Sequence, residues 1–248
     1  MIQTFDFFTE LQCHRLVDDI LADRALFRRS PLNDKNFPFF NLGSISKDDS
    51  VDVRQEQLQR HYAVYGPYLE CVFEVISKHY HPLKFIPDLT LPSFAIYLPT
   101  PNMRHLLDYG LAHRDDIYAA IARESEYDWD AESLMPLTIC LSLTERTGLN
   151  VWDTTDKDEP RLVEAYTAYA AAMEDALDLE KCARVFAAQQ VLLDDHDMTY
   201  VPYELGKGVL QLGNSWHQPV IFARTQPRIT LQGMVLWSRA KQFWALVK

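Results

Sequence analysis

From about Leu91 onward, the sequence consists mainly of short runs that are rich in β-branched and aromatic residues. These runs read "LPSFAIYL", "PLTICLSL", "LNVWD", "GVLQLG", "PVIFAR" and "RITLQGMVLW", and turn residues such as Pro101-Asn102 and Gly213-Asn214 separate several of them. Runs of this length and composition between turn residues are typical of β-strands. Many short strands in the later part of a chain predict a β-sandwich or a jelly roll.

The first 90 residues have a different pattern, which predicts helices. Thr9 followed by Gln12 has the form of a capping box, and apolar residues then recur at the three-to-four spacing of a helix. A second helical pattern extends from Leu58 to Ile76, and we expect Gly66-Pro67 to kink or split it. We therefore expect residues 1–90 to form mainly helical support for the strands that follow.

A further helical segment interrupts the strands at about residues 160–190, where Leu162 and Tyr166 begin an amphipathic pattern. Such an insertion is either a lid over a site or simple packing on the outer face of the strands. The predicted fold class is therefore α+β, with one domain over residues 1–248. Its core is the β-sandwich or jelly roll of residues 91–248, which carries the helical insertion.

Composition excludes several classes of function. The net charge is −11, so binding to nucleic acid, which needs a clustered basic surface, is not expected. No apolar run approaches the roughly 20 residues that span a bilayer, and the N-terminal residues lack the pattern of a secretion signal. We expect a cytoplasmic protein. The charged insertion suggests a solvated surface first and a homodimer contact second.

The stretch "GLAHRDDIY" offers two metal-ligating side chains. If "LAHRD" is a strand, alternation places His113 and Asp115 on the same face. His217, just beyond the strand "GVLQLG", is the best candidate for a third ligand. Two histidines and one carboxylate form the facial triad of non-heme Fe(II) oxygenases. The alternatives are a surface pair of His113 with Asp115, or Asp116 as the ligand if the segment is coil.

A further pair of polar residues follows His217 at a short distance. Arg228 lies 11 residues later and opens the strand "RITLQG", and Thr230 shares its face by the same alternation. A planar guanidinium binds a carboxylate through two hydrogen bonds, and a neighbouring hydroxyl adds another. The alternative is an edge-strand arginine in an ordinary ion pair.

The sequence resembles the Fe(II)- and 2-oxoglutarate-dependent oxygenases in four segments and in the order of these segments along the chain. The segments are H-R-D, "GLNVWD", "YVPYELGKGVLQLGNSWHQ" and "RITLQG". The core of these enzymes is a double-stranded β-helix, a cupin-like jelly roll. The resemblance implies Fe(II) bound by His113, Asp115 and His217, with 2-oxoglutarate as cosubstrate and O2 as oxidant. It also implies that Arg228 pairs with the far carboxylate of 2-oxoglutarate, assisted by Thr230.

Within this family the sequence looks most like small bacterial enzymes that hydroxylate or halogenate free amino acids or their derivatives, some within natural-product pathways. The halogenases carry a small residue at the carboxylate position, whereas Asp115 fills it here. The resemblance therefore implies a hydroxylase, or a desaturase or cyclase of the same family. A non-oxidative cupin-like metal-binding protein is the alternative, and Arg228 argues against it. Trp152 is either a wall of the cosubstrate pocket or a core residue.

Overall fold

The computed structural model describes residues 2–29, 39–43, 50–86, 91–99, 110, 112–115, 127–144, 146–153, 159–174, 179–212, 215–221 and 225–247. Within these ranges the helices are α1 (Glu10–Ala22), α2 (Val51–Ser77), α4 (Glu159–Glu174) and α5 (Leu179–Leu193), with a short 3-10 helix at Arg24–Leu26. The strands are β1 (Ile2–Asp6), β2 (Arg28–Arg29), β3 (Phe39–Leu42), β4 (Leu83–Phe85), β5 (Ser93–Tyr97), β6 (Trp129–Cys140), β7 (Gly148–Trp152), β8 (Met198–Pro202), β9 (Lys207–Gln211), β10 (His217–Val220), β11 (Arg228–Ser238) and β12 (Phe243–Val247).

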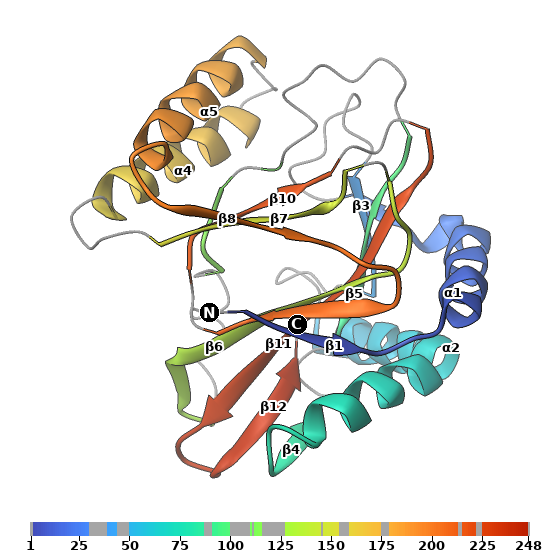
Figure 1. Ribbon diagram of the computed structural model, residues 1–248. Helices are drawn as coiled ribbons and strands as arrows, with labels where there is room; N and C mark the ends of the chain where they lie inside the picture. The colour runs from blue at the N-terminus through green and yellow to red at the C-terminus, as the bar shows by residue number, and fades with distance from the viewer. Residues whose placement is uncertain are drawn as a thin grey trace.

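The described strands form two sheets, so the chain is of the mixed α+β class. The larger sheet has nine strands in the order β1-β9-β6-β11-β5-β3-β2, with β12 paired to β11 and β4 paired to β12. β11 lies at its centre and pairs in antiparallel register with both β5 and β6. The smaller sheet has the order β10-β7-β8 and lies across from the larger one (Figure 1).

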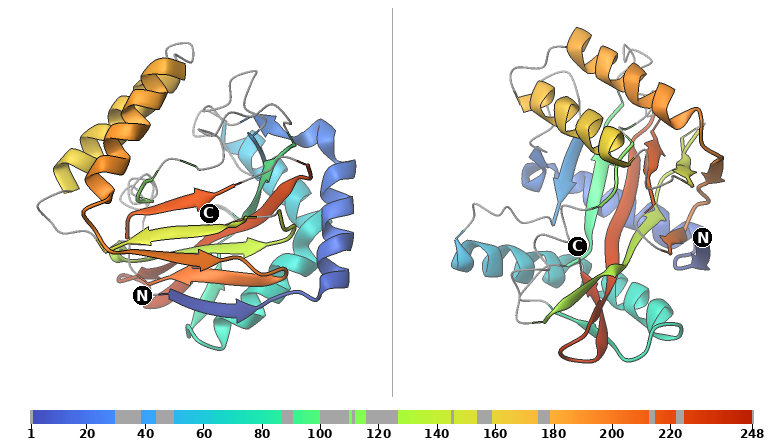
Figure 2. Two further views of the ribbon diagram at one scale, coloured as in Figure 1. Left: turned by 45° about the horizontal axis from the view of Figure 1, so that its top comes forward. Right: turned by 90° about the vertical axis from the view of Figure 1, so that its left-hand side faces the viewer.

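Helices α1 and α2 cover one face of the larger sheet, as Figure 2 shows. Ile229 and Leu231 of β11 are buried in one apolar cluster with Leu16 and Ile20 of α1 and Val72 of α2. Successive side chains of a strand point to opposite faces. Arg228 and Thr230, which alternate with Ile229 and Leu231, therefore point away from the helices. This alternation decides which residues of β11 reach the space between the sheets.

The helical prediction for the first 90 residues is correct for the two helices and incomplete for the rest. Thr9 Oγ1 accepts from the Gln12 backbone N–H at 3.3 Å, and Gln12 Oε1 accepts from the Thr9 backbone N–H at 2.8 Å, so the expected capping box begins α1. However, β1, β2, β3 and β4 also lie in this part of the chain. β1 pairs with β9, more than 200 residues later, and local patterning does not report such distant pairing.

The sequence predicted a kink or a split at Gly66-Pro67, and the split was wrong, because α2 runs without interruption from Val51 to Ser77 with Pro67 inside it. Proline removes one helical hydrogen bond at the cost of a few kcal/mol. Tyr65 and Leu69, on either side of Pro67, are both buried in the main apolar cluster. Their burial stabilises the helix on both sides of the proline, which shows tertiary packing overriding local propensity.

An apolar layer fills part of the space between the two sheets. Cys140 of β6 and Val209 of β9 pack against Leu149 of β7 and against Tyr203, with Val151 at the margin of the same cluster. The face of β7 that carries Leu149 and Val151 is therefore the face that meets the larger sheet. The residues that alternate with them, Asn150 and Trp152, lie on the outer face.

The insertion consists of two helices, α4 and α5, where the sequence predicted one. They lie beside each other over the smaller sheet, on the opposite side of the molecule from α1 and α2 (Figures 1 and 2). Leu162 of α4 and Leu193 of α5 are buried with Trp152, Trp216 and Ala112. The insertion therefore packs on the outer face of this sheet. No helix in the described ranges is long and apolar enough to cross a membrane.

Candidate active site

His113, Asp115 and His217 come together as a group of potential metal ligands, as the sequence predicted. The ligand atoms of the three side chains all lie within 4.8 Å of one another. His113 Nε2 is 3.9 Å from Asp115 Oδ1, and His217 Nε2 is 3.6 Å from Asp115 Oδ2. Asp116, the alternative ligand, lies outside the described residues.

Backbone pairing holds the two histidines beside each other. The His113 N–H donates to the His217 carbonyl at 2.8 Å, and the His217 N–H donates to the His113 carbonyl at 2.9 Å. Within residues 112–115, the described part of the expected strand over "LAHRD", the pairing is this single bridge, and Asp115 lies in a bend two residues after His113. Asp115 therefore reaches the histidines by way of a bend and not by strand alternation.

The surroundings of His217 keep its imidazole neutral. His217 is 5% exposed, and burial, with the adjacent His113 as a second cause, lowers its pKa to about 4, although Asp115 opposes the shift. Its Nδ1 lies 3.0 Å from the Ser215 carbonyl oxygen. A proton on Nδ1 donates to that carbonyl, which leaves the lone pair of Nε2 directed toward Asp115. This is the usual arrangement of a histidine that ligates a metal.

The donor set fits a single divalent iron. The separations between Asp115 and the two histidines are too long for hydrogen bonds, but three donor atoms around one ion lie a few ångströms apart. Two imidazoles and one carboxylate on one side of an ion leave further coordination positions open, which a purely structural site does not do. The residues present are therefore suited to an ion that also binds small molecules.

Arg228 and Thr230 form a second polar group, on β11. Arg228 is 1% exposed and Thr230 is fully buried. Within the described part of the chain, Arg228 Nε and Nη1 and Thr230 Oγ1 have no hydrogen-bond partner. A buried guanidinium without an anion is unfavourable, because burial removes its hydration and nothing replaces it. These atoms are therefore positioned to receive an anionic ligand.

Two tyrosines flank the guanidinium. The Cζ atom of Arg228 lies 5.2 Å from the ring centroid of Tyr97 and 5.6 Å from that of Tyr203. Burial raises the pKa of both hydroxyls, that of Tyr203 to about 12, and Arg228 opposes the shift in both. Both tyrosines stay protonated at neutral pH and hold the guanidinium plane through their rings.

The metal group and the arginine face the same space between the two sheets. Thr230 pairs with Cys140, which packs against Leu149 of the smaller sheet, so the Arg228 face of β11 is turned toward that sheet. His217 pairs with Val151, and directly paired residues share a face, so His217 points inward as well. An anion bound by Arg228 lies in the same interior layer as the three ligands.

Trp152 is not brought to this group. It lies on the outer face of β7, where it is 5% exposed and packs against Leu162, Leu193 and Trp216. A role for Trp152 in holding the cosubstrate stays a prediction that rests on the sequence.

Sequence reasoning missed Tyr97 and Tyr203, which are ordinary strand aromatics until the fold places them beside Arg228.

No family model matches this sequence, and no curated protein matches it. Among solved structures, the chain is similar to an N-substituted L-amino acid dioxygenase from Burkholderia ambifaria AMMD, with a TM-score of 0.50 at 11% identity over 100% of this chain and 86% of that chain. It is also similar to SnoK, a non-heme alpha-ketoglutarate-dependent carbocyclase from nogalamycin biosynthesis, with a TM-score of 0.50 at 11% identity over 96% of this chain and 81% of that chain. This similarity confirms, at the level of the fold, the resemblance drawn from the sequence motifs.

Proposed function

We propose that this chain is an Fe(II)- and 2-oxoglutarate-dependent oxygenase that hydroxylates an unactivated C–H bond of a small molecule. The observation that carries the proposal is the buried pair Arg228 and Thr230, which has no hydrogen-bond partner in the described ranges and lies in the same layer as the group of His113, Asp115 and His217. A metal group alone suits many proteins. The arginine adds a site for a dicarboxylate next to that group, which a non-oxidative cupin-like protein does not need.

In this proposal His113, Asp115 and His217 hold the iron, and the keto acid end of 2-oxoglutarate also binds there. Iron and 2-oxoglutarate held there would supply, with O2, the oxidising power to break a C–H bond, and the 2-oxoglutarate would be converted to succinate and carbon dioxide. Arg228 binds the far carboxylate through its unpartnered Nε and Nη1, and the hydroxyl of Thr230 donates to the same group.

The remaining contributions of the protein are positioning and exclusion of water. The Ser215 carbonyl fixes the ring of His217 so that Nε2 faces the ion. Apolar residues of the layer between the sheets, such as Leu149 and Val209, keep water from the site. Two facing sheets with β11 at the centre support the proposal of a double-stranded β-helix core.

The proposed substrate class is a free amino acid or an amino acid derivative. The motifs that resemble the small bacterial amino acid enzymes support this, as does the fold shared with the Burkholderia dioxygenase that is named for N-substituted amino acids. Asp115 occupies the position that is small in the related halogenases, which supports hydroxylation over halogenation. The family also contains desaturases and cyclases, which remain outcomes of the test.

The experiment is to measure succinate formation across a panel of free and N-substituted amino acids, with Fe(II), 2-oxoglutarate and O2 present and mass analysis of the products. The proposal expects succinate in proportion to a product that has gained one oxygen atom. A product that has lost hydrogen instead identifies a desaturase or cyclase. Metal binding without any succinate, with or without substrate, would favour the cupin-like alternative. The matched control is Asp115→Ala, which removes one ligand of the ion.

A further inference from the structure

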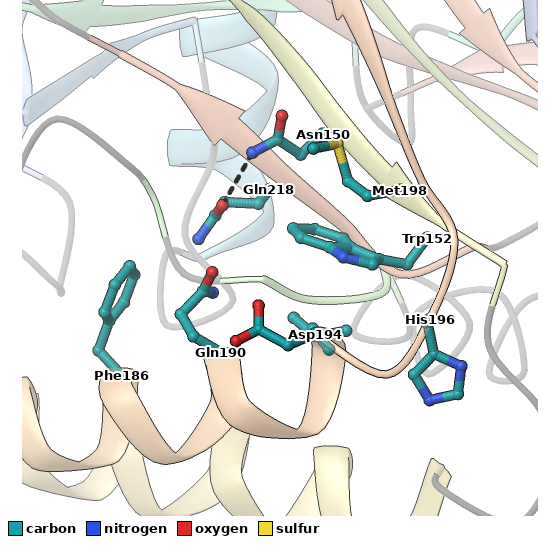
Figure 3. Close-up of a pocket in the computed structure, with 9 residues that line it drawn as sticks. Asn150, Trp152, Phe186, Gln190, Asp194, His196, Met198 and Gln218 are labelled. Carbon is teal, nitrogen blue, oxygen red and sulfur yellow. Dashed lines mark hydrogen bonds between the residues drawn. The ribbon is translucent and has the colours of Figure 1, made fainter.

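A pocket of about 400 Å³ lies outside the site described above, between α5 and the outer face of the smaller sheet. Figure 3 shows its lining: Phe186 and Gln190 project from α5 and Asp194 directly follows this helix, while Asn150, Trp152 and Gln218 come from β7 and β10. Gln218 and Asn150 are directly paired, on the face opposite to His217 and Val151. The smaller sheet therefore separates this pocket from the metal group.

The polar groups of the pocket are incompletely paired. Gln218 is 1% exposed, and its Oε1 accepts from Asn150 Nδ2 at 3.1 Å. Gln218 Nε2 and Gln190 Nε2 are buried without a hydrogen-bond partner in the described part of the chain. Buried amide donors are rarely left unpaired, because each costs free energy unless a ligand or water satisfies it. Figure 3 shows the amide nitrogen of Gln218 directed toward the space between Phe186 and Gln190.

We propose that this pocket binds a small neutral molecule with a flat apolar part and a carboxamide group. The unpartnered amide donors require an acceptor oxygen, and the Asp194 carboxylate accepts from an N–H of the ligand. No lysine or arginine is among the described residues that line the pocket; the titratable side chains among them are Asp194 and His196, and the Asp194 carboxylate repels an anionic ligand. The rings of Trp152 and Phe186 provide the apolar walls.

The test uses benzamide as the probe and benzoate as its charged analogue, added to the full chain. Binding is followed by calorimetry and by the indole N–H signal of Trp152 in NMR spectra. The proposal expects benzamide to bind at least tenfold more tightly than benzoate. Gln218→Met, which keeps the shape and removes the donor, should weaken benzamide binding about fivefold. Gln57→Met on α2 is the matched control and should leave binding unchanged.

Equal affinity for benzamide and benzoate, or unchanged benzamide affinity in Gln218→Met, would overturn the proposal. If Gln218→Met does not fold, Asp194→Asn at an exposed position takes its place. That variant removes the negative charge and should bring the affinity for benzoate close to that for benzamide. If Asp194→Asn prefers benzamide over benzoate by as large a ratio of affinities as the wild type does, the proposal is also overturned.

A different contact of α5 carries a second inference, which rests on the proposed metal centre. Gln189 is fully buried and binds both polar groups of the Ala112 backbone: the Ala112 N–H donates to Gln189 Oε1 at 3.2 Å, and Gln189 Nε2 donates to the Ala112 carbonyl at 2.7 Å. Ala112 directly precedes the ligand His113. The two-point contact fixes both the position and the direction of this peptide.

We infer that Gln189 is a positioning residue for the metal centre and that the helical insertion braces the ligand segment. In the described part of the chain, the backbone of this segment pairs with β10 through the bridge between His113 and His217 and through the Gly110 N–H, which donates to the Pro219 carbonyl at 2.7 Å. Without Gln189, the buried N–H and carbonyl of Ala112 would lose these partners, and the segment would shift to satisfy them. The position of the His113 side chain therefore depends on α5.

The test compares Gln189→Met with Gln190→Met, the same substitution at the adjacent residue that faces the pocket. Co(II) replaces Fe(II), because its visible spectrum reports the coordination. Gln189→Met should bind Co(II) about tenfold more weakly than the wild type, with an altered spectrum, as expected for loss of a residue that orients a ligand. Gln190→Met should match the wild type in both. Gln189→Glu, which keeps the acceptor for the Ala112 N–H, should be intermediate and serves if Gln189→Met does not fold.

If Gln189→Met or Gln189→Glu has the same Co(II) affinity and the same spectrum as the wild type, Gln189 does not position the ligand. The proposal of a metal centre would then still stand. Absence of Co(II) binding by the wild type would overturn both. The two failures are therefore distinguishable.

Discussion

Replacing Arg228 with methionine separates binding of the cosubstrate from stability of the fold. In the wild type, Arg228 Nε and Nη1 are buried without a partner among the residues that the structure describes, so the guanidinium lowers stability until an anion binds. Arg228→Met replaces this charge with an apolar side chain of similar length. We expect the ligand-free variant to be as stable as the wild type or more stable, and 2-oxoglutarate to bind much more weakly.

The magnitude follows from the two lost charge-assisted hydrogen bonds. Each contributes about 1.5 kcal/mol or more, so about 3 kcal/mol is lost, which is roughly a hundredfold in affinity. With 2-oxoglutarate at about 100 times its wild-type Kd, ligand binding stabilises the wild type by about 2.7 kcal/mol. For a chain of this size that raises Tm by about 5–10 °C. At the same concentration Arg228→Met should gain only about 1 °C.

The assay is thermal unfolding in the presence of Mn(II) with and without 2-oxoglutarate, supported by calorimetric titration. Arg239→Met is the matched control, because Arg239 follows the same strand but has a side chain that is 56% exposed and pairs with Asp130 at 2.6 Å. This control should keep the full rise in Tm. If 2-oxoglutarate raises the Tm of Arg228→Met as much as that of the wild type, Arg228 is not the residue that binds the far carboxylate.

Three further substitutions test the ligand set, the hydroxyl beside Arg228 and the packing of the fold. Asp115→Gly should lose Fe(II) affinity and succinate formation, and full retention of either would show that Asp115 is not a ligand. Thr230→Val should weaken 2-oxoglutarate binding about fivefold by calorimetry, and an unchanged Kd would remove Thr230 from the site. Ile20→Ala, at a fully buried position of α1, should lower the free energy of unfolding in urea by about 2–4 kcal/mol; a loss below about 0.5 kcal/mol would contradict the packing of α1 on the larger sheet.

The meeting of His217 with His113 and Asp115 joins distant segments and was predicted from the motifs. The other features that the sequence predicted depend on local periodicity. Alternation in "RITLQG" placed Arg228 and Thr230 on one face, and the structure has them buried on the inner face of β11. The capping box at Thr9 predicted the start of α1 to the residue. In each case the relevant contact lies within a few positions along the chain, so the pattern of residues is sufficient.

The parts that could not be predicted depend on contacts between distant segments. β1 joins the larger sheet through β9, and Pro67 stays helical because of buried neighbours. Gln189 looks like any polar residue of an amphipathic helix until the fold places it against Ala112. Trp152 lies on the outer face of β7 because of the way the smaller sheet is turned, which alternation within β7 alone does not specify.

The central claim is that one ferrous ion, held by His113, Asp115 and His217, shares a site with the 2-oxoglutarate that Arg228 binds. Absorption spectroscopy under anaerobic conditions, with Fe(II) and then 2-oxoglutarate added to the wild type and to His217→Ala, tests it most directly. The claim predicts a visible charge-transfer band in the wild type that requires both additions, and no such band in His217→Ala. An unchanged spectrum of the Fe(II)-loaded wild type on addition of 2-oxoglutarate would contradict it.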